Sequence, residues 1–216
     1  MALSTEVVQQ IVNRLKAVDT QTLIYKTIAA DRIGKRLSSE EISRKIDIAE
    51  QLAKQLVHHY KDTLKLETVE QLVAYLKLNV EFREEKIEEY MAIIGFFESP
   101  NRIVVNDVYR QNDAFWLAHG LPECTFERWS QVVIAHEAFH AIQEQKKLDL
   151  SEFETELWQF AGFKKCSPIT ALIEVVANYF AQYYTDFELY PALLDNVALL
   201  PLYPEAVSEQ VSSLSK

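Results

Sequence analysis

The stretch Val-Val-Ile-Ala-His-Glu-Ala-Phe-His-Ala-Ile, residues 132–142, contains the pattern His-Glu-x-x-His, with His136 and His140 as its histidines. On an α-helix, side chains four residues apart lie on one face, one turn above the other. Both imidazoles can therefore reach a single Zn²⁺ ion. The apolar residues around them are typical of a buried helix. The stretch thus predicts a helix that supplies two ligands of a zinc site.

Glu137 projects from nearly the same side of this predicted helix. In such a site this carboxylate is a general base, which takes a proton from the water that zinc activates. The alternative interpretation is that the two histidines are ordinary core or interface residues. Chance produces the four-position pattern in a chain of this length on the order of one per cent of the time or less. We therefore favour the zinc site.

A catalytic zinc site takes three protein ligands and keeps one position open. Gln143 and Lys146 stand where the extended metzincin pattern has a glycine and a third histidine, which excludes that class, and the inverted pattern His-x-x-Glu-His is absent. A glutamate is the third ligand that remains. The candidates are Glu144, Glu152, Glu154, Glu156 and Glu174.

Glu174 is the preferred candidate because it lies in a mostly apolar helical stretch, residues 170–178. Burying a lone carboxylate there is costly unless a cation or hydrogen-bond donors meet it. Asn178 lies one turn further along the same face, where it can accept the outer N–H of a ligating histidine. The alternative is that Glu174 pairs with a lysine or caps a neighbouring element.

An HExxH helix followed by a glutamate from a later helix resembles the arrangement in gluzincins, the thermolysin-like metallopeptidases. Residues 174–181, Glu-Val-Val-Ala-Asn-Tyr-Phe-Ala, are similar to the Glu-x-Glu-Ala-Asn-x-Phe-Ala pattern of ImmA/IrrE-type metallopeptidases, with Val176 in place of the second acidic residue. The resemblance covers roughly residues 90–186. It implies a zincin-like core and an edge strand that receives an extended peptide by strand addition, for which residues 102–106 are the candidate.

A further donor is expected for the oxyanion that forms during hydrolysis. The sequence offers four candidates and does not choose among them: Tyr179, Tyr183, Tyr184 and His119.

Composition limits the alternatives. The chain of 216 residues is 49% apolar and carries a formal net charge of −10, which argues against a general nucleic-acid or anionic-membrane binder. A basic helix-turn-helix at residues 26–45 is a weaker alternative because acidic residues interrupt it. No apolar run is long enough to span a membrane and no signal peptide is visible. We therefore expect a cytoplasmic protein with reduced thiols at Cys124 and Cys166.

The pattern along the chain predicts an α+β protein that is mostly helical, with a helical region at 1–80 and a zincin-like core at 81–216, or one continuous domain. Runs rich in β-branched and aromatic residues predict a hairpin from 90–97 and 102–106, and residues 81–89 are expected to form a solvated helix or turn. Capping signals, including a proposed N-cap at Thr125 and Ser167 before Pro168, predict the helix starts. The expected helices cover roughly residues 4–18, 38–60, 68–76, 113–119, 125–147, 151–162, 169–186 and 192–200.

The sequence therefore predicts a zinc metallopeptidase that acts on a peptide or protein substrate. The competing hypothesis is a non-catalytic zinc-binding or degenerate peptidase-like module that regulates or binds a protein partner. Zinc content and peptide cleavage separate the two.

Overall fold

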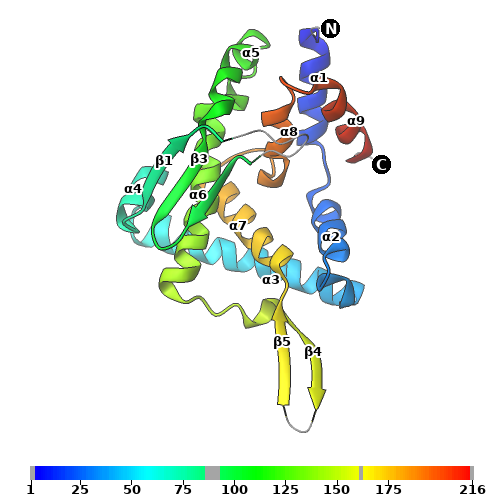
Figure 1. Ribbon diagram of the computed structural model, residues 1–216, viewed down its shortest axis with the longest axis vertical. Coiled ribbons are helices and arrows are strands. Elements are labelled where there is room, and N and C mark those ends of the chain that lie inside the picture. Colours follow the sequence, from blue (N-terminus) through cyan, green and yellow to red (C-terminus); the bar gives the residue numbers. More distant parts are fainter. Residues whose placement is uncertain (1–2, 86–92, 161–162, 215–216) are drawn as a thin grey trace.

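The protein is α+β and mostly helical, with one small mixed sheet and a separate hairpin, as the sequence predicts at this coarse level (Figure 1). The computed structural model describes residues 3–85, 93–160 and 163–214. The helices are α1 (Thr5–Lys16), α2 (Thr20–Ala30), α3 (Ser39–Val57), α4 (Val69–Tyr75), α5 (Asp113–Ala118), α6 (Phe126–Lys146), α7 (Thr170–Thr185), α8 (Leu194–Leu199) and α9 (Pro204–Leu214). The strands are β1 (Asn79–Arg83), β2 (Gly95–Glu98), β3 (Arg102–Asn106), β4 (Glu154–Phe160) and β5 (Phe163–Pro168).

The main sheet has the order β1-β3-β2, with β1 parallel and β2 antiparallel to β3. The predicted hairpin of β2 and β3 is confirmed, although its part at residues 90–92 lies outside the described residues. The expectation of a helix or turn from residue 81 is wrong for residues 81–83, which belong to β1. The sequence did not predict this strand because its side chains are densely charged. Its Glu81 pairs with Arg102 on the neighbouring β3, and Arg102 also pairs with Glu98 on β2.

The prediction that residues 102–106 form an edge strand is also wrong. β3 is the central strand and is paired on both sides, with Ile103, Val104 and Val105 fully buried. Among the described strands β2 pairs only with β3, so within this part of the chain the unpaired edge nearest α6 belongs to β2. The hydrophobic run of β3 is typical of a strand buried on both faces.

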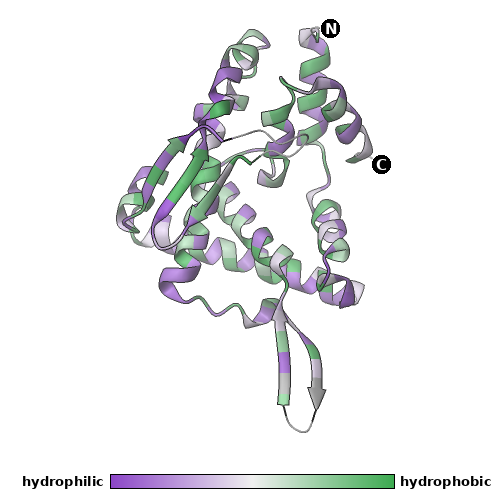
Figure 2. Cartoon of the chain, in the orientation of Figure 1, coloured by the Kyte–Doolittle hydropathy of each residue, from purple (hydrophilic) through white to green (hydrophobic). Residues whose placement is uncertain are grey.

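Helix α6 lies between the sheet and α7, and α3 packs along α7 from the N-terminal part of the chain (Figure 1). Buried residues of α1 to α4 belong to the same hydrophobic cluster as those of α6 and α7. Figure 2 shows hydrophobic and hydrophilic residues on alternate sides of the outer helices. The proposed boundary near residue 80 stays a prediction. No helix within the described ranges has the length and apolar character that crossing a membrane requires.

Some helix ends follow their sequence signals. Ser38 accepts a hydrogen bond from the backbone N–H of Glu41 (3.2 Å), whose carboxylate accepts one in return from the N–H of Ser38 (2.8 Å), so this predicted capping box is confirmed. Gly120 follows α5 with a φ of +70°, as a glycine after a helix end does. Thr125 does occupy the N-cap of α6, but its hydroxyl donates to Pro122 rather than to the helix.

The predicted helix at 151–162 is wrong, because Ser151–Phe153 form a short 3₁₀ turn and β4 and β5 form an antiparallel hairpin that projects from the body (Figure 1). A long-range contact stabilises this structure, because the buried Lys45 on α3 donates hydrogen bonds to the backbone carbonyls of Glu152 and Glu154. Ser167 and Pro168 end β5 rather than cap α7, which begins at Thr170.

Gly95 lets the edge strand approach the HExxH helix. A Cβ atom at this position would lie 2.4 Å from Cγ1 of Val133 and 3.0 Å from the carbonyl oxygen of Val104. We expect Gly95→Ala to lower the free energy of unfolding by about 1–3 kcal/mol, as overpacking does. Urea unfolding measures the loss, which should be smaller in a Val133→Ala background. An equal loss in both backgrounds would contradict this contact.

Candidate metal centre

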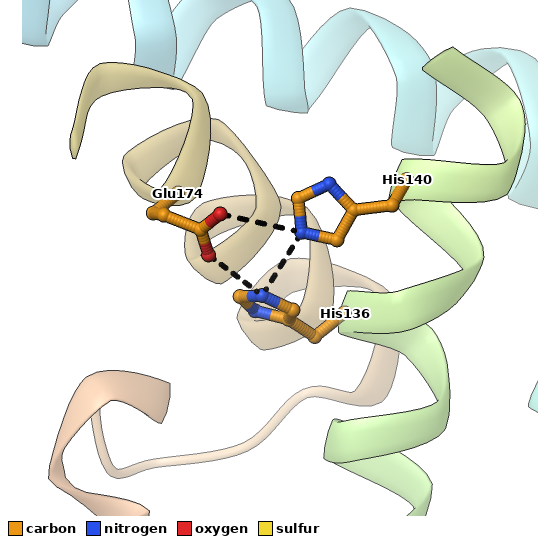
Figure 3. Close-up of side chains that lie close together, drawn as sticks. All are labelled: His136, His140 and Glu174. Atoms are coloured by element: carbon orange, nitrogen blue, oxygen red, sulfur yellow. Dashed lines mark hydrogen bonds and ion pairs between the residues drawn. The ribbon is translucent and has the colours of Figure 1, made fainter. Parts of the chain in front are cut away.

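Two histidines of α6 and one glutamate of α7 direct their side chains at a common point (Figure 3). His136 Nε2 lies 3.1 Å from Glu174 Oε2 and 3.3 Å from His140 Nε2, and His140 Nε2 lies 3.6 Å from Glu174 Oε1. All three side chains are partly exposed, so solvent reaches the group. The three residues are those that the sequence predicts as ligands.

These separations fit a tetrahedral ion. Ligand atoms about 2.0–2.1 Å from Zn²⁺ at tetrahedral angles lie about 3.3–3.4 Å from one another. The observed separations of 3.1, 3.3 and 3.6 Å are close to that value, with a different oxygen of Glu174 facing each imidazole. Two imidazole nitrogens and a carboxylate oxygen also form a donor set that Zn²⁺ accepts. His136, His140 and Glu174 could therefore hold a zinc ion.

The packing of α6 against α7 places Glu174 opposite the histidines. Both helices carry fully buried alanines, which allow their axes to approach. Phe139 and Phe180 add a ring contact with centroids 6.2 Å apart. The fully buried alanines are Ala135, Ala138, Ala141, Ala177 and Ala181.

Each histidine has a partner on its outer nitrogen. His136 Nδ1 lies 3.1 Å from Asn178 Oδ1, and His140 Nδ1 lies 3.5 Å from Gln143 Oε1. An amide oxygen only accepts, so each Nδ1 donates to its amide partner. A neutral imidazole of this tautomer presents the Nε2 lone pair to a metal at the common point, whereas a protonated imidazole donates from Nε2 to Glu174. The sequence predicts the role of Asn178 but not that of Gln143, which lies three residues after His140 on the same helix.

Glu174 and His140 shift one another's pKa values. Burial raises the pKa of Glu174, but hydrogen bonds from both imidazoles outweigh it and hold that pKa well below its usual range. Burial lowers the pKa of His140, but the hydrogen bond and charge of Glu174, with smaller contributions from Glu137 and Gln143, outweigh it, so the net shift is upward. The carboxylate of Glu174 therefore stays ionised, which is the form that binds a metal.

Glu137 is buried beside this group and is not one of the three converging residues. Burial raises the pKa of its carboxyl, and this effect exceeds the opposing influence of His136, His140 and the backbone N–H of Phe97. A carboxylate with a raised pKa is a stronger base than an exposed one. Its environment therefore suits proton transfer.

A cleft of about 330 Å³ opens on this group. Its lining comes from Ile94 and Gly95 at the start of β2, from α6 including Glu137, from α7, and from the segment 191–195. Larger cavities lie elsewhere on the molecule, but this one brings two of the three ligand candidates, His136 and Glu174, together with the base candidate Glu137 and the edge strand. It is therefore the candidate substrate cleft.

The four candidate oxyanion donors lie outside the cleft lining. The Tyr179 hydroxyl accepts from Gln21 and the Tyr183 hydroxyl donates to Glu50, and both residues line another cavity. The Tyr184 hydroxyl donates to the carbonyl of Leu66, and His119 Nδ1 lies 3.0 Å from the Thr5 hydroxyl. The structure thus does not bring these four residues to the cleft beside His136, His140 and Glu174.

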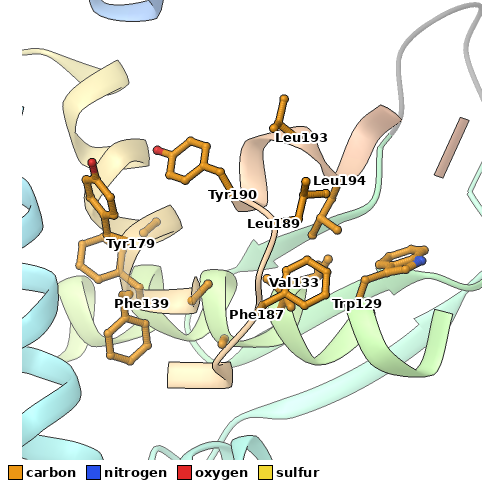
Figure 4. Packing of buried hydrophobic residues seen from close by; sticks show 14 of the residues in the cluster. Trp129, Val133, Phe139, Tyr179, Phe187, Leu189, Tyr190, Leu193 and Leu194 are labelled. Atoms are coloured by element: carbon orange, nitrogen blue, oxygen red, sulfur yellow. The ribbon is translucent and has the colours of Figure 1, made fainter. Parts of the chain in front are cut away.

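Sequence reasoning missed Tyr190, which is 4% exposed and packs edge-on against Tyr179 (Figure 4). Its hydroxyl is buried and has no partner of good hydrogen-bond geometry among the described residues. Burial raises its pKa strongly, and a contact with Asn178 of hydrogen-bond type opposes this shift. A buried hydroxyl held only by such a poorly aligned contact can turn to donate to a ligand group. No local sequence pattern distinguishes this tyrosine from its neighbours.

The other glutamate candidates have other neighbours. Glu144 accepts a hydrogen bond from the Ser99 hydroxyl, and Glu152 pairs with Arg44 at 3.5 Å. Glu154 and Glu156 lie in β4. Cys124 and Cys166 are free thiols, as predicted, and neither belongs to the converging group.

No protein-family model, no curated protein and no solved structure matches the chain. The geometry of the site is therefore the basis for assigning a function to the protein.

Proposed function

We propose that the protein is a zinc-dependent metallopeptidase with a zincin-like core. The observation that carries this proposal is the convergence of His136, His140 and Glu174 beside the buried carboxylate of Glu137. The arrangement of β2, α6 and α7 around one cleft supports the same assignment. The substrate is a peptide or protein segment.

Zn²⁺ bound by these three residues supplies the Lewis acidity that polarises a carbonyl and makes water more acidic. Glu137 takes the proton from the attacking water and returns it to the leaving amine. Asn178 and Gln143 hold the two imidazoles in the tautomer that keeps Nε2 free.

The free edge of β2 is the proposed place for the substrate backbone. The N–H of Asn106 on β3 donates to the carbonyl of Ile94, so alternate residues from Ile94 onward face β3. The backbone groups of Gly95 therefore face the free edge, at the cleft. An extended peptide would pair there by strand addition and bring a carbonyl towards Glu137.

Tyr190 does not itself line the cleft, but its hydroxyl lies close to Asn178 and Glu174, which do, and it is the proposed donor to the oxyanion. Tyr190→Phe should lower kcat by about 10²-fold with little change in KM, because the hydrogen bond is made only as charge develops. Steady-state kinetics on one peptide measures the effect. Tyr179→Phe is the matched control, since the Tyr179 hydroxyl is held by Gln21. Equal kcat values in the wild type and Tyr190→Phe would remove this role.

Metal analysis and a peptide library test the proposal. We expect one zinc ion per chain after dialysis and cleavage products in mass spectra of a mixed peptide library. A chelator should stop cleavage, and added zinc should restore it. Stoichiometric zinc without cleavage of any peptide would instead favour a non-catalytic zinc-binding module.

A further inference from the structure

The substrate cleft contains a carboxylate that the proposed mechanism does not use. Asp195, on α8, lines the cavity together with Glu137 and Glu174. Solvent reaches its side chain, yet the surrounding protein removes enough water to raise the pKa of its carboxyl to about 6. Desolvation is the cause of this shift, and no cation among the described residues offsets the charge of Asp195.

The balance of charge in the cleft favours the binding of a cationic ligand group. Zn²⁺ together with ionised Glu174 and Glu137 sums to zero, which leaves Asp195 as one uncompensated negative charge at neutral pH. Among the described residues that line the cavity, none is a lysine or an arginine. A cationic ligand group would therefore meet attraction and no repulsion from the lining.

The rest of the lining fits the stem of a long basic side chain. Ile94, Val132, Val133 and Leu194 line the same cavity and are apolar. Lysine and arginine bury their methylene stems against such surfaces while their charged ends stay paired or hydrated. An apolar wall beside Asp195, the one lining carboxylate that the proposed mechanism leaves unused, matches that division along the side chain.

We propose that Asp195 makes the cleft selective for substrates with a lysine or arginine near the scissile bond. This specificity rests on the proposed peptidase function, since it assumes that a peptide occupies the cleft. Asp195 acts through an ion pair with the substrate side chain and takes no part in the proton transfers.

A binding measurement tests the proposal without relying on turnover. The probes are fluorescent alanine-rich decapeptides that carry either one lysine or one norleucine, and the protein is the zinc-loaded Glu137→Asp variant, which keeps the negative charge at this position but shortens the proposed base and so slows turnover. We expect the lysine peptide to bind at least about tenfold more tightly, as fluorescence anisotropy reports. Asp195→Asn in this background should remove the difference, and Asp195→Glu should retain it. Glu209→Gln, an exposed residue of α9, is the control of equal charge change.

The outcomes separate this proposal from the proposed function. Equal affinity for the two peptides, or a lysine preference that survives Asp195→Asn, would overturn the role of Asp195. Cleavage of the two peptides by the wild type at equal rates would also overturn it while leaving the peptidase standing. An Asp195-dependent preference in binding, with no cleavage of any peptide by the wild type, would support the specificity site and remove the peptidase.

Discussion

Glu137→Gln is expected to lower kcat for peptide hydrolysis by at least about 10²–10⁴-fold, the contribution of a positioned general base. Glutamine keeps the size of the side chain but cannot accept the proton. Because Glu137 is not one of the three converging ligands, the variant should still hold one zinc ion per chain. Parallel measurement of kcat and of zinc content checks both expectations.

The stability of this variant provides a second readout. Burial raises the pKa of Glu137 in the folded protein, so its ionised form destabilises the fold at neutral pH. Glutamine removes that charge, and the Tm of the metal-free variant should equal or exceed that of the wild type. Glu144→Gln, an exposed residue of the same helix, should leave turnover unchanged. Wild-type turnover in Glu137→Gln would remove Glu137 from the mechanism.

His140→Ala is expected to abolish the stabilisation of the protein by zinc. A ligand that binds only the folded state raises the free energy of unfolding by about 2.7 kcal/mol at a free concentration of 100 times its Kd. The wild type should therefore show a zinc-dependent rise in Tm. The variant retains two of the three converging groups and should show no rise at the same concentration.

Two further variants show how large the loss of zinc binding in His140→Ala is by comparison. Asn178→Ala removes the hydrogen bond to His136 Nδ1 and should weaken zinc affinity by about 10–100-fold. His58→Ala removes an exposed histidine that pairs with Asp62 and is not one of the three converging residues. This variant should bind zinc as the wild type does. A rise in Tm of wild-type size in His140→Ala would show that this residue is not a ligand.

The sequence predicted the converging residues because their signals are local. Helical spacing alone places His136 and His140 on one face, and the cost of a lone carboxylate in an apolar helix singles out Glu174. Helical spacing also places Asn178 one turn after Glu174, which identifies it as a hydrogen-bond partner of a histidine. The capping box at Ser38 and the end of α5 at Gly120 were predictable for the same reason.

Features that depend on distant contacts were not predictable from local patterns. The carbonyls that Lys45 binds fix the start of the β4–β5 hairpin where a capping signal suggested a helix. The central position of β3 depends on β1, whose charges hid it. Four tyrosines lie within residues 179–190, and only the packing of the chain after α7 brings Tyr190 to Asn178 and Glu174.

Diffraction at the zinc absorption edge tests the central claim most directly. Crystals of the zinc-loaded protein should give one strong anomalous peak, about 2.0–2.2 Å from His136 Nε2, from His140 Nε2 and from a carboxylate oxygen of Glu174. A fully loaded crystal with its zinc peak at other residues, such as Cys166, or with Glu174 turned away from the ion, would contradict the account.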